Sequence, residues 1–369
     1  MEAQNPGRGQ KELREWVQTA RLCTGCGACV GLCPYQVVYR DQTIILNDCD
    51  LPEGRCYAFC PRTPTDYDEL RKTLFDPADL TPELGPFRGF YITRAADPEI
   101  RKKAQHGGTV TALMSLALTQ GLIDTAIVAE GQTDLQQRGL TVHTLDEIQG
   151  HGKSRFLVSP TVAEFNKAVQ GEAQRIGVVA TPCQAQALAK MRLKPIPTND
   201  NHIDKLHLVI GLFCGWTLSW RPFSELLRSH TDLSDIIGMD IPAGKGVVEI
   251  RTRRGILTFT MDELAPHIRE GCRYCLDSTA EFADLSVGSA RLPADWEETR
   301  TWNQVIVRSK AGEELLGLAR SLGVLEFREV PPGNLEDLKK AAWEKKQTAK
   351  ERIREKGRST GPLVYAKVE

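Results

Sequence analysis

The sequence predicts a mixed α/β core that follows a small cysteine-rich module and precedes a C-terminal helix. Eleven cysteines fall in two blocks, and the first block occupies residues 23–60. Residues 89–330 alternate short apolar strands with helices, as α/β proteins do. Residues 335–358 mix lysine, arginine and glutamate over a helical length, which indicates a solvated or partner-facing helix. We therefore divide the chain into a module (1–66), a linker (67–88), a core (89–330) and a helical tail (331–369).

Composition is that of an ordinary soluble protein, with 41% hydrophobic and 26% charged residues. The formal net charge of −1 argues against a nucleic-acid or anionic-membrane partner. The polar start, Met1 to Glu12, does not resemble a secretion signal. The longest apolar stretch, 206–216, falls short of the roughly 20 residues of a spanning helix. We expect a cytoplasmic protein without a transmembrane segment, where thiolate-bound iron is more stable than disulfides.

The first block begins after a short amphipathic helix expected over residues 1–20. It is spelled Cys23-Thr-Gly-Cys26-Gly-Ala-Cys29-Val-Gly-Leu-Cys33-Pro34. This C-x2-C-x2-C-x3-C-P spacing is typical of bacterial ferredoxins, in which three thiolates wrap one [4Fe-4S] cluster and the fourth turns to another. Gly25 and Gly27 let the backbone approach the cluster sulfides. A structural zinc site usually has two separated cysteine pairs instead.

The second half of the module is Cys49-Asp-Leu-Pro-Glu-Gly-Arg-Cys56-Tyr-Ala-Phe-Cys60-Pro61. By the ferredoxin pattern, Cys60 completes the cluster of Cys23, Cys26 and Cys29. The remaining thiols, Cys33, Cys49 and Cys56, lack the fourth cysteine of a second cluster. Either Asp48 or Asp50 completes that site, or it holds a three-iron cluster, or the three thiols only pack in the interior.

The core begins with a strand at 90–93, a Gly-rich turn at 106–111 and a helix at 112–120. Buried strands follow at 125–129, 175–180 and 207–214. Residues 236–260 form antiparallel strands with a turn at Arg254-Gly255, and a strand at 303–308 precedes a helix at 312–322. We find no G-x-G-x-x-G after a strand, so a separate Rossmann nicotinamide site is not expected.

The second block places Cys183 and Cys214 at the ends of two apolar strands and Cys272 and Cys275 in one C-x2-C loop. Strand ends converge in an α/β sheet, and four thiolates are the number that a cubane needs. The alternative is that Cys183 and Cys214 are small buried side chains, as free cysteines often are.

Several motifs in order give the chain a family resemblance: Gly107-Gly-Thr-Val-Thr-Ala-Leu113, Gly121-Leu-Ile-Asp124, Thr181-Pro-Cys-Gln-Ala-Gln-Ala-Leu188, Gly211-Leu-Phe-Cys214, and Cys272-Arg-Tyr-Cys-Leu-Asp277 with Ala283-Asp-Leu-Ser286. The set resembles the beta-subunit family of coenzyme F420-reducing hydrogenases and F420-linked formate dehydrogenases. Chlorophyll-derivative reductases and subunits of other electron-transfer complexes share this fold. The resemblance covers roughly residues 20–330.

The resemblance implies an α/β (α+β mixed) flavin-binding core, with FAD beside a cubane held by the four cysteines of the second block. The turn Gly107-Gly108-Thr109, with Thr111, would pass under the FAD phosphates. The further cofactor-binding residues implied are His106, Lys153, Ser154, Arg155, Ser159, Thr181 and Gln184. His106 would tune the flavin electrostatically, or it is simply a capping or surface residue.

One departure from the family pattern concerns Gly288-Ser289, where the family usually has a Gly-Asp pair. Losing that acid near the flavin would change which two-electron donor is accepted. The predicted function is exchange of hydride with coenzyme F420 or NAD(P)H at FAD, and of single electrons through two or three [4Fe-4S] clusters with ferredoxin or iron–sulfur partner subunits. The alternatives are a relay subunit without a hydride-carrier site, and a reductase of an organic substrate.

Overall fold

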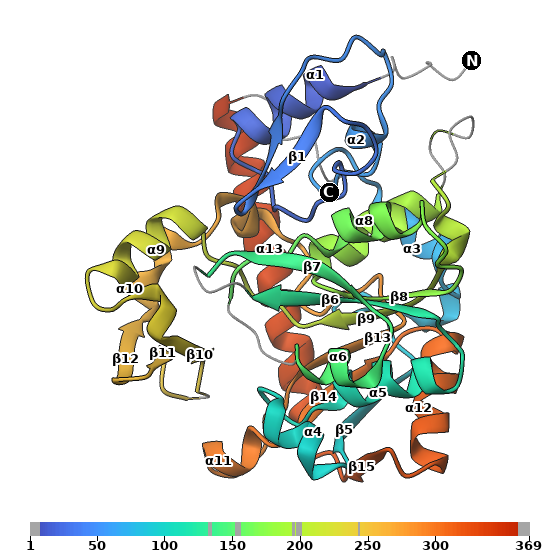
Figure 1. Ribbon diagram of the computed structural model, residues 1–369, viewed down its shortest axis with the longest axis vertical. Helices are drawn as coiled ribbons and strands as arrows, with labels where there is room; N and C mark the ends of the chain where they lie inside the picture. Colours follow the sequence, from blue (N-terminus) through green and yellow to red (C-terminus); the bar gives the residue numbers. More distant parts are fainter. Residues whose placement is uncertain are drawn as a thin grey trace.

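The computed structural model describes residues 8–131, 135–151, 156–193, 196, 201–242 and 244–360 (Figure 1). Its centre is an eight-stranded mixed sheet. The order across the sheet is β15 (Leu325–Arg328), β5 (Gly89–Ala95), β14 (Asn303–Val307), β13 (Leu285–Ser289), β9 (Leu206–Leu212), β8 (Ile176–Ala180), β6 (Thr125–Gly131) and β7 (Gln137–Val142). The strands and helices expected between residues 90 and 322 are present. Strands β7 and β13 and several helices are additional.

Five strands of this sheet run in the same direction. Strands β13, β9, β8 and β6 are parallel neighbours. Strand β5 runs in the same direction, because it is antiparallel to β14 and β14 is antiparallel to β13. Their carboxyl ends therefore lie at one edge of the sheet, which we call the carboxyl edge. Cys183 and Cys214 follow β8 and β9 there, and Ala95 at the end of β5 bonds to the Gly107 carbonyl. Ligands of open α/β sheets gather at such an edge.

Helices cover both faces of the sheet because the strand side chains alternate. Ala126 and Val128 of β6 pack with α5 (Thr109–Thr119), α6 (Leu145–Gln149) and α12 (Lys310–Ser321). Ile127 points to the other face, with α7 (Thr161–Ala168) and α8 (Pro182–Arg192). The result is a three-layer core.

A smaller unit stands beside the carboxyl edge. It contains the antiparallel strands β10 (Ile236–Asp240), β11 (Val247–Thr252) and β12 (Gly255–Thr260), with α9 (Trp220–Arg228) and α10 (Met261–Leu264). It has its own apolar core, which includes Phe223 and Ile250. Gln105, in the turn after α4 (Pro98–Lys103), donates to the Met239 carbonyl at 3.3 Å and so ties this unit to the sheet.

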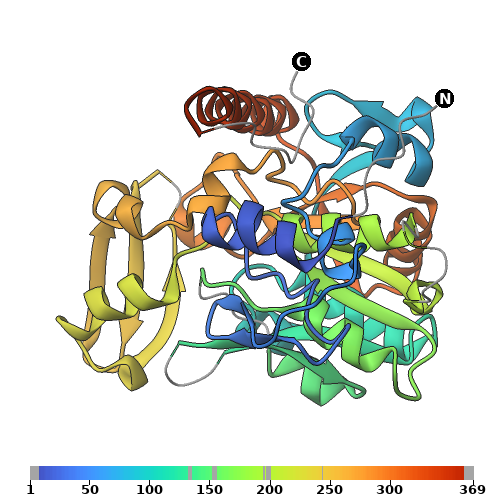
Figure 2. The same ribbon diagram turned by 90° about the horizontal axis from the view of Figure 1, so that it is seen from above.

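The N-terminal cysteine module lies over α7 and α8 (Figure 2). It contains α1 (Gln10–Leu13), a π-helical turn (Arg14–Thr19), the hairpin β1 (Gln36–Tyr39) and β2 (Gln42–Ile45), and α2 (Arg55–Ala58). Asn166 of α7 donates to the Ala28 and Val30 carbonyls at 3.2 and 2.7 Å. Asp41 forms a buried ion pair with Arg269 of the core. These contacts fix the module against the core.

The segment expected as a linker is more structured than predicted. It contains α3 (Tyr67–Leu74), a 3-10 turn (Pro77–Asp79), and the short strands β3 (Leu80–Thr81) and β4 (Gly85–Pro86). Leu70 and Leu84 are fully buried, and the Tyr67 hydroxyl donates to Gln186 of α8 at 2.9 Å. The expectation of a segment draped over the surface is corrected, because its apolar side chains complete the core.

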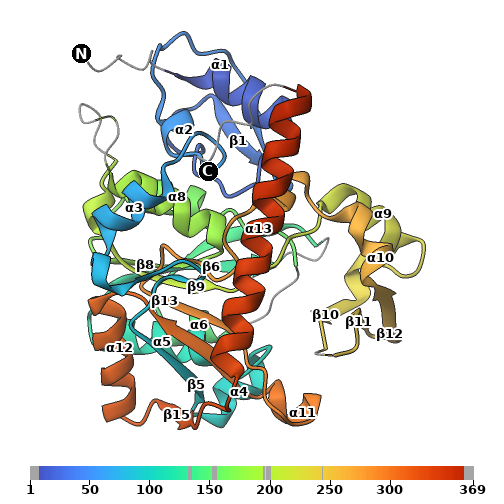
Figure 3. The same cartoon turned by 180° about the vertical axis from the view of Figure 1, so that it is seen from behind.

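The C-terminal helix α13 (Asn334–Thr360) also differs from the expected solvated tail. Figure 3 shows it running along the back of the core up to the cysteine module. Ala342, Lys346, Ala349 and Ile353 recur every three or four residues and are buried, so one face of the helix belongs to the core. Trp343 remains exposed. No helix within the described ranges has the length and apolar composition that crossing a membrane requires.

Candidate functional site

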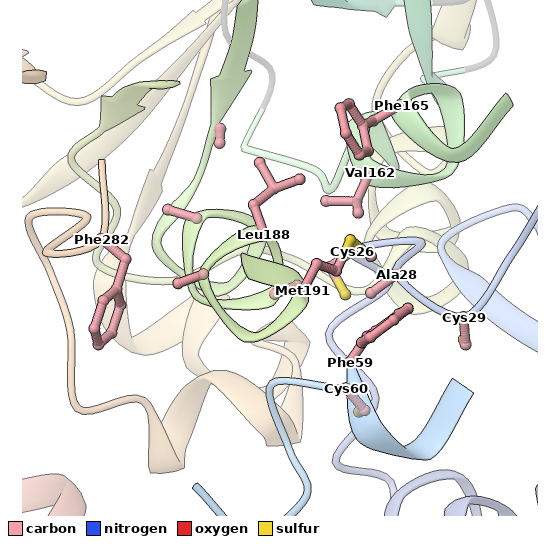
Figure 4. Packing of buried hydrophobic residues seen from close by; sticks show 14 of the residues in the cluster. Cys26, Ala28, Cys29, Phe59, Cys60, Val162, Phe165, Leu188, Met191 and Phe282 are labelled. Carbon is pink, nitrogen blue, oxygen red and sulfur yellow. The ribbon is translucent and has the colours of Figure 1, made fainter. Parts of the chain in front are cut away.

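Four cysteines of the module line one small cavity. We call this the module pocket, and its cysteines are Cys23, Cys26, Cys29 and Cys60. Leu13 and Val17 of the N-terminal helical segment and Thr43 of β2 line it as well. Figure 4 shows Cys26, Cys29 and Cys60 around Ala28 and Phe59, next to Met191 of α8. The structure thus brings together the four cysteines that ferredoxin spacing grouped.

The backbone of this pocket suits thiolate ligands. The Gly25 N–H points at the Cys23 sulfur and the Arg62 N–H at the Cys60 sulfur, both at 3.4 Å. Gly27 has a φ of +84°, and a Cβ there would lie 2.7 Å from the Ala163 side chain. Glycine at this position therefore serves two needs, since it permits the loop conformation and lets the loop lie against α7.

The second four-cysteine cavity lies at the carboxyl edge of the sheet. We call it the sheet-edge pocket, and its cysteines are Cys183, Cys214, Cys272 and Cys275. Cys183 is in the first turn of α8, where Pro182 occupies the first position and Thr181 the cap. The N-terminus of this 11-residue helix favours negative charge. Cys214 comes from the loop after β9, Cys272 from a 3-10 turn (Glu270–Tyr274), and Cys275 directly follows that turn.

Hydroxyl groups contact two sulfurs of the sheet-edge pocket. Thr181 Oγ1 lies 3.4 Å from Cys183 Sγ, and Thr217 Oγ1 lies 3.4 Å from Cys272 Sγ. The two pockets are neighbours, because Thr24 lines both. Cys26 of one pocket and Cys183 of the other are close enough for the charge of Cys183 to raise the pKa of Cys26, in addition to the larger effect of burial.

Burial raises the pKa of most of these thiols, as it does for Cys29, Cys183 and Cys214, and raises the pKa of Cys60 to about 11. Cys275 differs. Burial raises its pKa, but the nearby cations Lys345 and Arg62 outweigh that effect, and the pKa of Cys275 is lowered. A buried thiol becomes a thiolate readily when a metal replaces its proton.

Three buried or half-buried cations stand at the pockets. Lys190 of α8 donates to the Cys60 carbonyl at 2.7 Å and to Thr63 Oγ1 at 2.8 Å. Arg62 and Lys345 line the sheet-edge pocket. Burial lowers the pKa of Lys190 to about 8, against the opposing charges of Cys60 and Cys26. Positive side chains here offset the negative charge of a thiolate-ligated cluster.

The donor sets match cubane clusters better than single metal ions. Among the described residues, no group of three or more His, Cys, Asp and Glu side chains is arranged to hold one metal ion. In a cubane each cysteine binds a different iron, so its ligand sulfurs stand around a cavity instead of meeting at a point. Four thiols around one cavity fit that requirement in both pockets, with N–H groups aimed at two sulfurs of the module pocket and hydroxyls at two sulfurs of the sheet-edge pocket.

The remaining cysteines, Cys33, Cys49 and Cys56, lie close enough together for their charges to interact. Cys33 and Cys49 raise the pKa of Cys56 through their charges, after the larger effect of burial. Gln36 of β1 is 2% exposed, and its amide lowers the pKa of Cys56. Neither Gln36 amide atom has a hydrogen-bond partner of normal geometry within the described residues. Asp48, which the sequence suggested as a ligand, is 84% exposed and ion-paired with Arg14.

The predicted phosphate turn is largely closed by protein groups. Gly107, Gly108 and Thr109 are buried. The Thr109 N–H donates to Asn303 Oδ1 at 3.2 Å, and its hydroxyl bonds to Thr93 at 2.9 Å. A Cβ at Gly107 would lie 2.9 Å from the Thr301 carbonyl. Thr111, in the first turn of α5, stays half-buried. An anion at this helix would have to bind beyond Thr109, near Thr111.

Three of the other predicted flavin residues, Ser159, Thr181 and Gln184, lie at the start of α8. Thr181 and Gln184 form a capping box at α8, and Gln184 also donates to the Ser159 carbonyl. These three residues therefore stand beside Cys183 and hold the start of α8. Lys153, Ser154 and Arg155 lie outside the described residues.

His106 lies with its ring centroid 6.0 Å from that of Trp296, in the short helix α11 (Trp296–Thr299). Burial lowers its pKa, against the opposing charge of Asp240. The structure brings the sheet-edge pocket and the Gly-rich turn to the same edge of the sheet. His106, however, packs against Trp296 and feels the charge of Asp240 in β10.

Sequence reasoning missed several residues of the site: Thr24, Arg62, Lys190, Trp216, Thr217 and Lys345. Arg62 follows the Cys60-Pro61 motif directly, so its position in the sequence could have indicated that it lies near the cysteines. No sequence signal indicated Lys190 or Lys345, because lysines on helices usually face solvent.

Two family models match the chain. The N-terminal model for the beta subunit of coenzyme F420 hydrogenase/dehydrogenase matches residues 90–165, and the C-terminal model matches residues 173–332. The coenzyme F420 hydrogenase subunit beta of Methanothermobacter thermautotrophicus is 30% identical over 76% of this chain and 99% of its own length. That of Methanosarcina barkeri is 33% identical over 73% and 94%. A chain in a solved structure of the F420-reducing nickel–iron hydrogenase complex from Methanosarcina barkeri has a TM-score of 0.69 at 31% identity, covering 75% of this chain and 95% of that one.

Proposed function

The chain belongs to the coenzyme F420 hydrogenase/dehydrogenase beta-subunit family, and on that premise we propose that it is the subunit through which an F420-linked complex converts hydride transfer into single-electron transfer. Family membership makes it an oxidoreductase subunit of a larger complex. The proposed cofactors are FAD and two or three iron–sulfur clusters, and the proposed hydride carrier is coenzyme F420.

The observation that carries this proposal is the pair of adjacent four-cysteine pockets. One pocket belongs to the carboxyl edge of the sheet and the other to the module, and Thr24 lines both. Clusters in two cavities that share a wall form a short electron path from the sheet to the surface module. A pair of structural metal sites would not need to be adjacent.

Each of the two pockets has protein groups that suit a negatively charged cluster. Thr181 and Thr217 place hydroxyls at two sulfurs of the sheet-edge pocket, and Arg62 and Lys345 place positive charge beside it. Lys190 does the same for the module pocket. We propose that these groups hold the clusters and set their potentials, since hydrogen bonds and charge near the sulfurs determine cluster potential.

FAD supplies the exchange between two-electron and one-electron chemistry when it is bound. Its proposed place is the carboxyl edge, with an anionic group near Thr111 and the Thr181–Gln184 cap beside the sheet-edge pocket. Because no G-x-G-x-x-G follows a strand, the hydride carrier would stack on the flavin itself.

Cys33, Cys49 and Cys56 are proposed as ligands of a third, outermost cluster, with Gln36 in place of the missing fourth cysteine. The buried amide of Gln36 faces the Cys56 thiol, whereas Asp48 is already paired with Arg14. Cys33 is exposed, so this site would exchange electrons with a ferredoxin or iron–sulfur partner subunit. Iron content separates the cases, with about 11 or 12 atoms per chain for three clusters and about 8 for two.

The test of the function is electron transfer by the anaerobically purified chain. Iron and flavin are counted first. Reduced F420, NADH and NADPH are then each mixed with the chain in a stopped-flow instrument, with a viologen dye as acceptor. We expect reduced F420 to bleach the flavin and then the clusters. A fully loaded chain that accepts electrons from none of the three donors would contradict the proposal.

One observation favours a second candidate, an electron-relay subunit without a hydride-carrier site. The Gly107–Thr109 turn is buried, and the Thr109 N–H and hydroxyl already have protein partners. A relay would contain full iron and no FAD, and dithionite but none of the hydride donors would reduce it.

A further inference from the structure

The C-terminal helix reaches the sheet-edge pocket through one side chain, Lys345. The family models end at residue 332, so α13 lies outside the matched region. Lys345 lines the pocket together with Cys183, Cys214, Cys272 and Cys275. Its Nζ donates to the Cys214 carbonyl at 2.8 Å and to the Asp277 carbonyl at 3.0 Å. One of its bonds therefore goes to the backbone of a cysteine, and the other to the backbone two residues after Cys275.

The charge of Lys345 is not offset in these bonds, because both acceptors are neutral carbonyl oxygens. A fixed cation at this place favours any state of the pocket that carries more negative charge.

The helix is held in place without Lys345. The next residue, Lys346, forms a buried ion pair with Glu281 and donates to the Glu83 carbonyl at 2.7 Å. Ala342, Ala349 and Ile353 are buried on the same side of the helix. Removing the charge of Lys345 therefore leaves the packing of α13 intact.

We propose that Lys345 raises the reduction potential of the cluster held in the sheet-edge pocket, so that the C-terminal helix controls electron flow between flavin and module. This inference rests on the proposed function, since it requires a cluster in that pocket. Reduction adds one electron to the cluster without forming or breaking a bond. The added negative charge is stabilised by the ammonium group, and the oxidised cluster is stabilised less. Lys345 is a positioning and tuning residue that does not touch the substrate.

The experiment is a redox titration of the whole chain, followed by electron paramagnetic resonance. The signal of the sheet-edge cluster is identified as the one lost in Cys272→Ala. Lys345→Met removes the charge, and Lys345→Arg keeps it. Lys340→Met is the matched control, because Lys340 is exposed on the same helix. Iron per chain is measured for every variant before the titration.

We expect Lys345→Met to keep its iron and to lower the reduced-to-oxidised ratio of this cluster at least tenfold at a fixed potential, a shift of about 59 mV for one electron. Lys345→Arg and Lys340→Met should titrate like the parent chain. An unchanged potential in an iron-replete Lys345→Met would overturn the inference, and so would loss of iron in that variant, since the lysine would then only hold the pocket together. A parent chain without iron in this pocket would refute the proposed function instead.

Discussion

Glu281 connects its own loop to α3 and α13 through buried ion pairs, and its replacement by glutamine should destabilise the fold strongly. Its carboxylate accepts from Arg71 of α3 at 2.6 Å and pairs with Lys346 of α13. The side chain is 1% exposed. Burial raises its pKa, but Lys346 and Arg71 outweigh burial and hold the pKa of Glu281 at about 2.

The size of the effect follows from this pKa. Lowering a carboxyl pKa from 4.5 to about 2 on folding corresponds to about 3 kcal/mol of stability at neutral pH. Because the pKa is lowered in the folded state, the contribution is complete above pH 4.5 and is lost as the pH falls towards 2. At pH 3 roughly 1.5 kcal/mol remains. Removing one member of a buried ion-pair network typically costs about 3–5 kcal/mol, which agrees in size.

The assay is urea unfolding of Glu281→Gln and the parent chain at pH 7, followed by tryptophan fluorescence. The matched control is Glu313→Gln, whose carboxylate also pairs with an arginine, Arg88, but is 57% exposed. We expect the control to lose less than about 1 kcal/mol, as surface pairs do. In the iron-free chain the gap between Glu281→Gln and parent should narrow at pH 3. If the two variants lost equal stability at pH 7, or the gap did not depend on pH, the reasoning would be refuted.

Three further predictions concern the cofactors. Iron analysis of Cys60→Ala should show the loss of one cluster, about four iron atoms per chain. Cys33→Ala should leave the cluster of the module pocket in place. Unchanged iron in Cys60→Ala would exclude Cys60 as a ligand of that cluster. Truncation after Gly333 should lower stability and deplete sheet-edge iron, because the helix that it removes buries Ala342, Ala349 and Ile353 against the core. A truncated chain with full iron would show that the helix only faces a partner. Thr111→Asp should weaken FAD binding in a fluorescence titration, since a carboxylate would repel the phosphates, and unaltered affinity would move the phosphate site elsewhere.

Gly108→Asp would be a poor test of the predicted flavin site. Gly108 has a φ of +78°, and a Cβ there would meet Ile100 at 3.0 Å and Ala95 at 3.3 Å. The substitution would strain the backbone and crowd the turn whether or not FAD binds there. Thr111 is half-buried within the first turn of α5 and avoids this problem.

Much of the fold was predictable because strands and helices express local periodicity. The apolar stretches at 125–129 and 207–214 predicted β6 and β9 for this reason. The grouping of Cys23, Cys26, Cys29 and Cys60 also followed from spacing, and the structure places these four around one cavity. That either pocket holds iron remains a prediction.

The errors have a common physical origin. The segment 67–88 and the helix α13 were assigned to the surface from their polar composition, yet Leu84 and Ala349 are buried. Each segment has few apolar side chains. Their burial can be recognised only when the part of the core against which they pack is known. Lys346 is the clearest case. Nothing in the sequence of a charge-mixed helix indicates that this lysine forms a buried ion pair with Glu281.

The sequence by itself determined the family, because the order of the family motifs is a local, readable pattern. The ligand spacing of the first cysteine block is equally local, and it predicted iron–sulfur chemistry. The sequence also determined that the strands ending at Cys183 and Cys214 would deliver their thiols to one edge of a sheet. Only the tertiary structure decided that the two pockets share Thr24, that Gln36 faces Cys56, and that Lys345 enters the sheet-edge pocket. These contacts join residues far apart in the chain, and no local pattern encodes them, since they depend on how whole helices and strands pack.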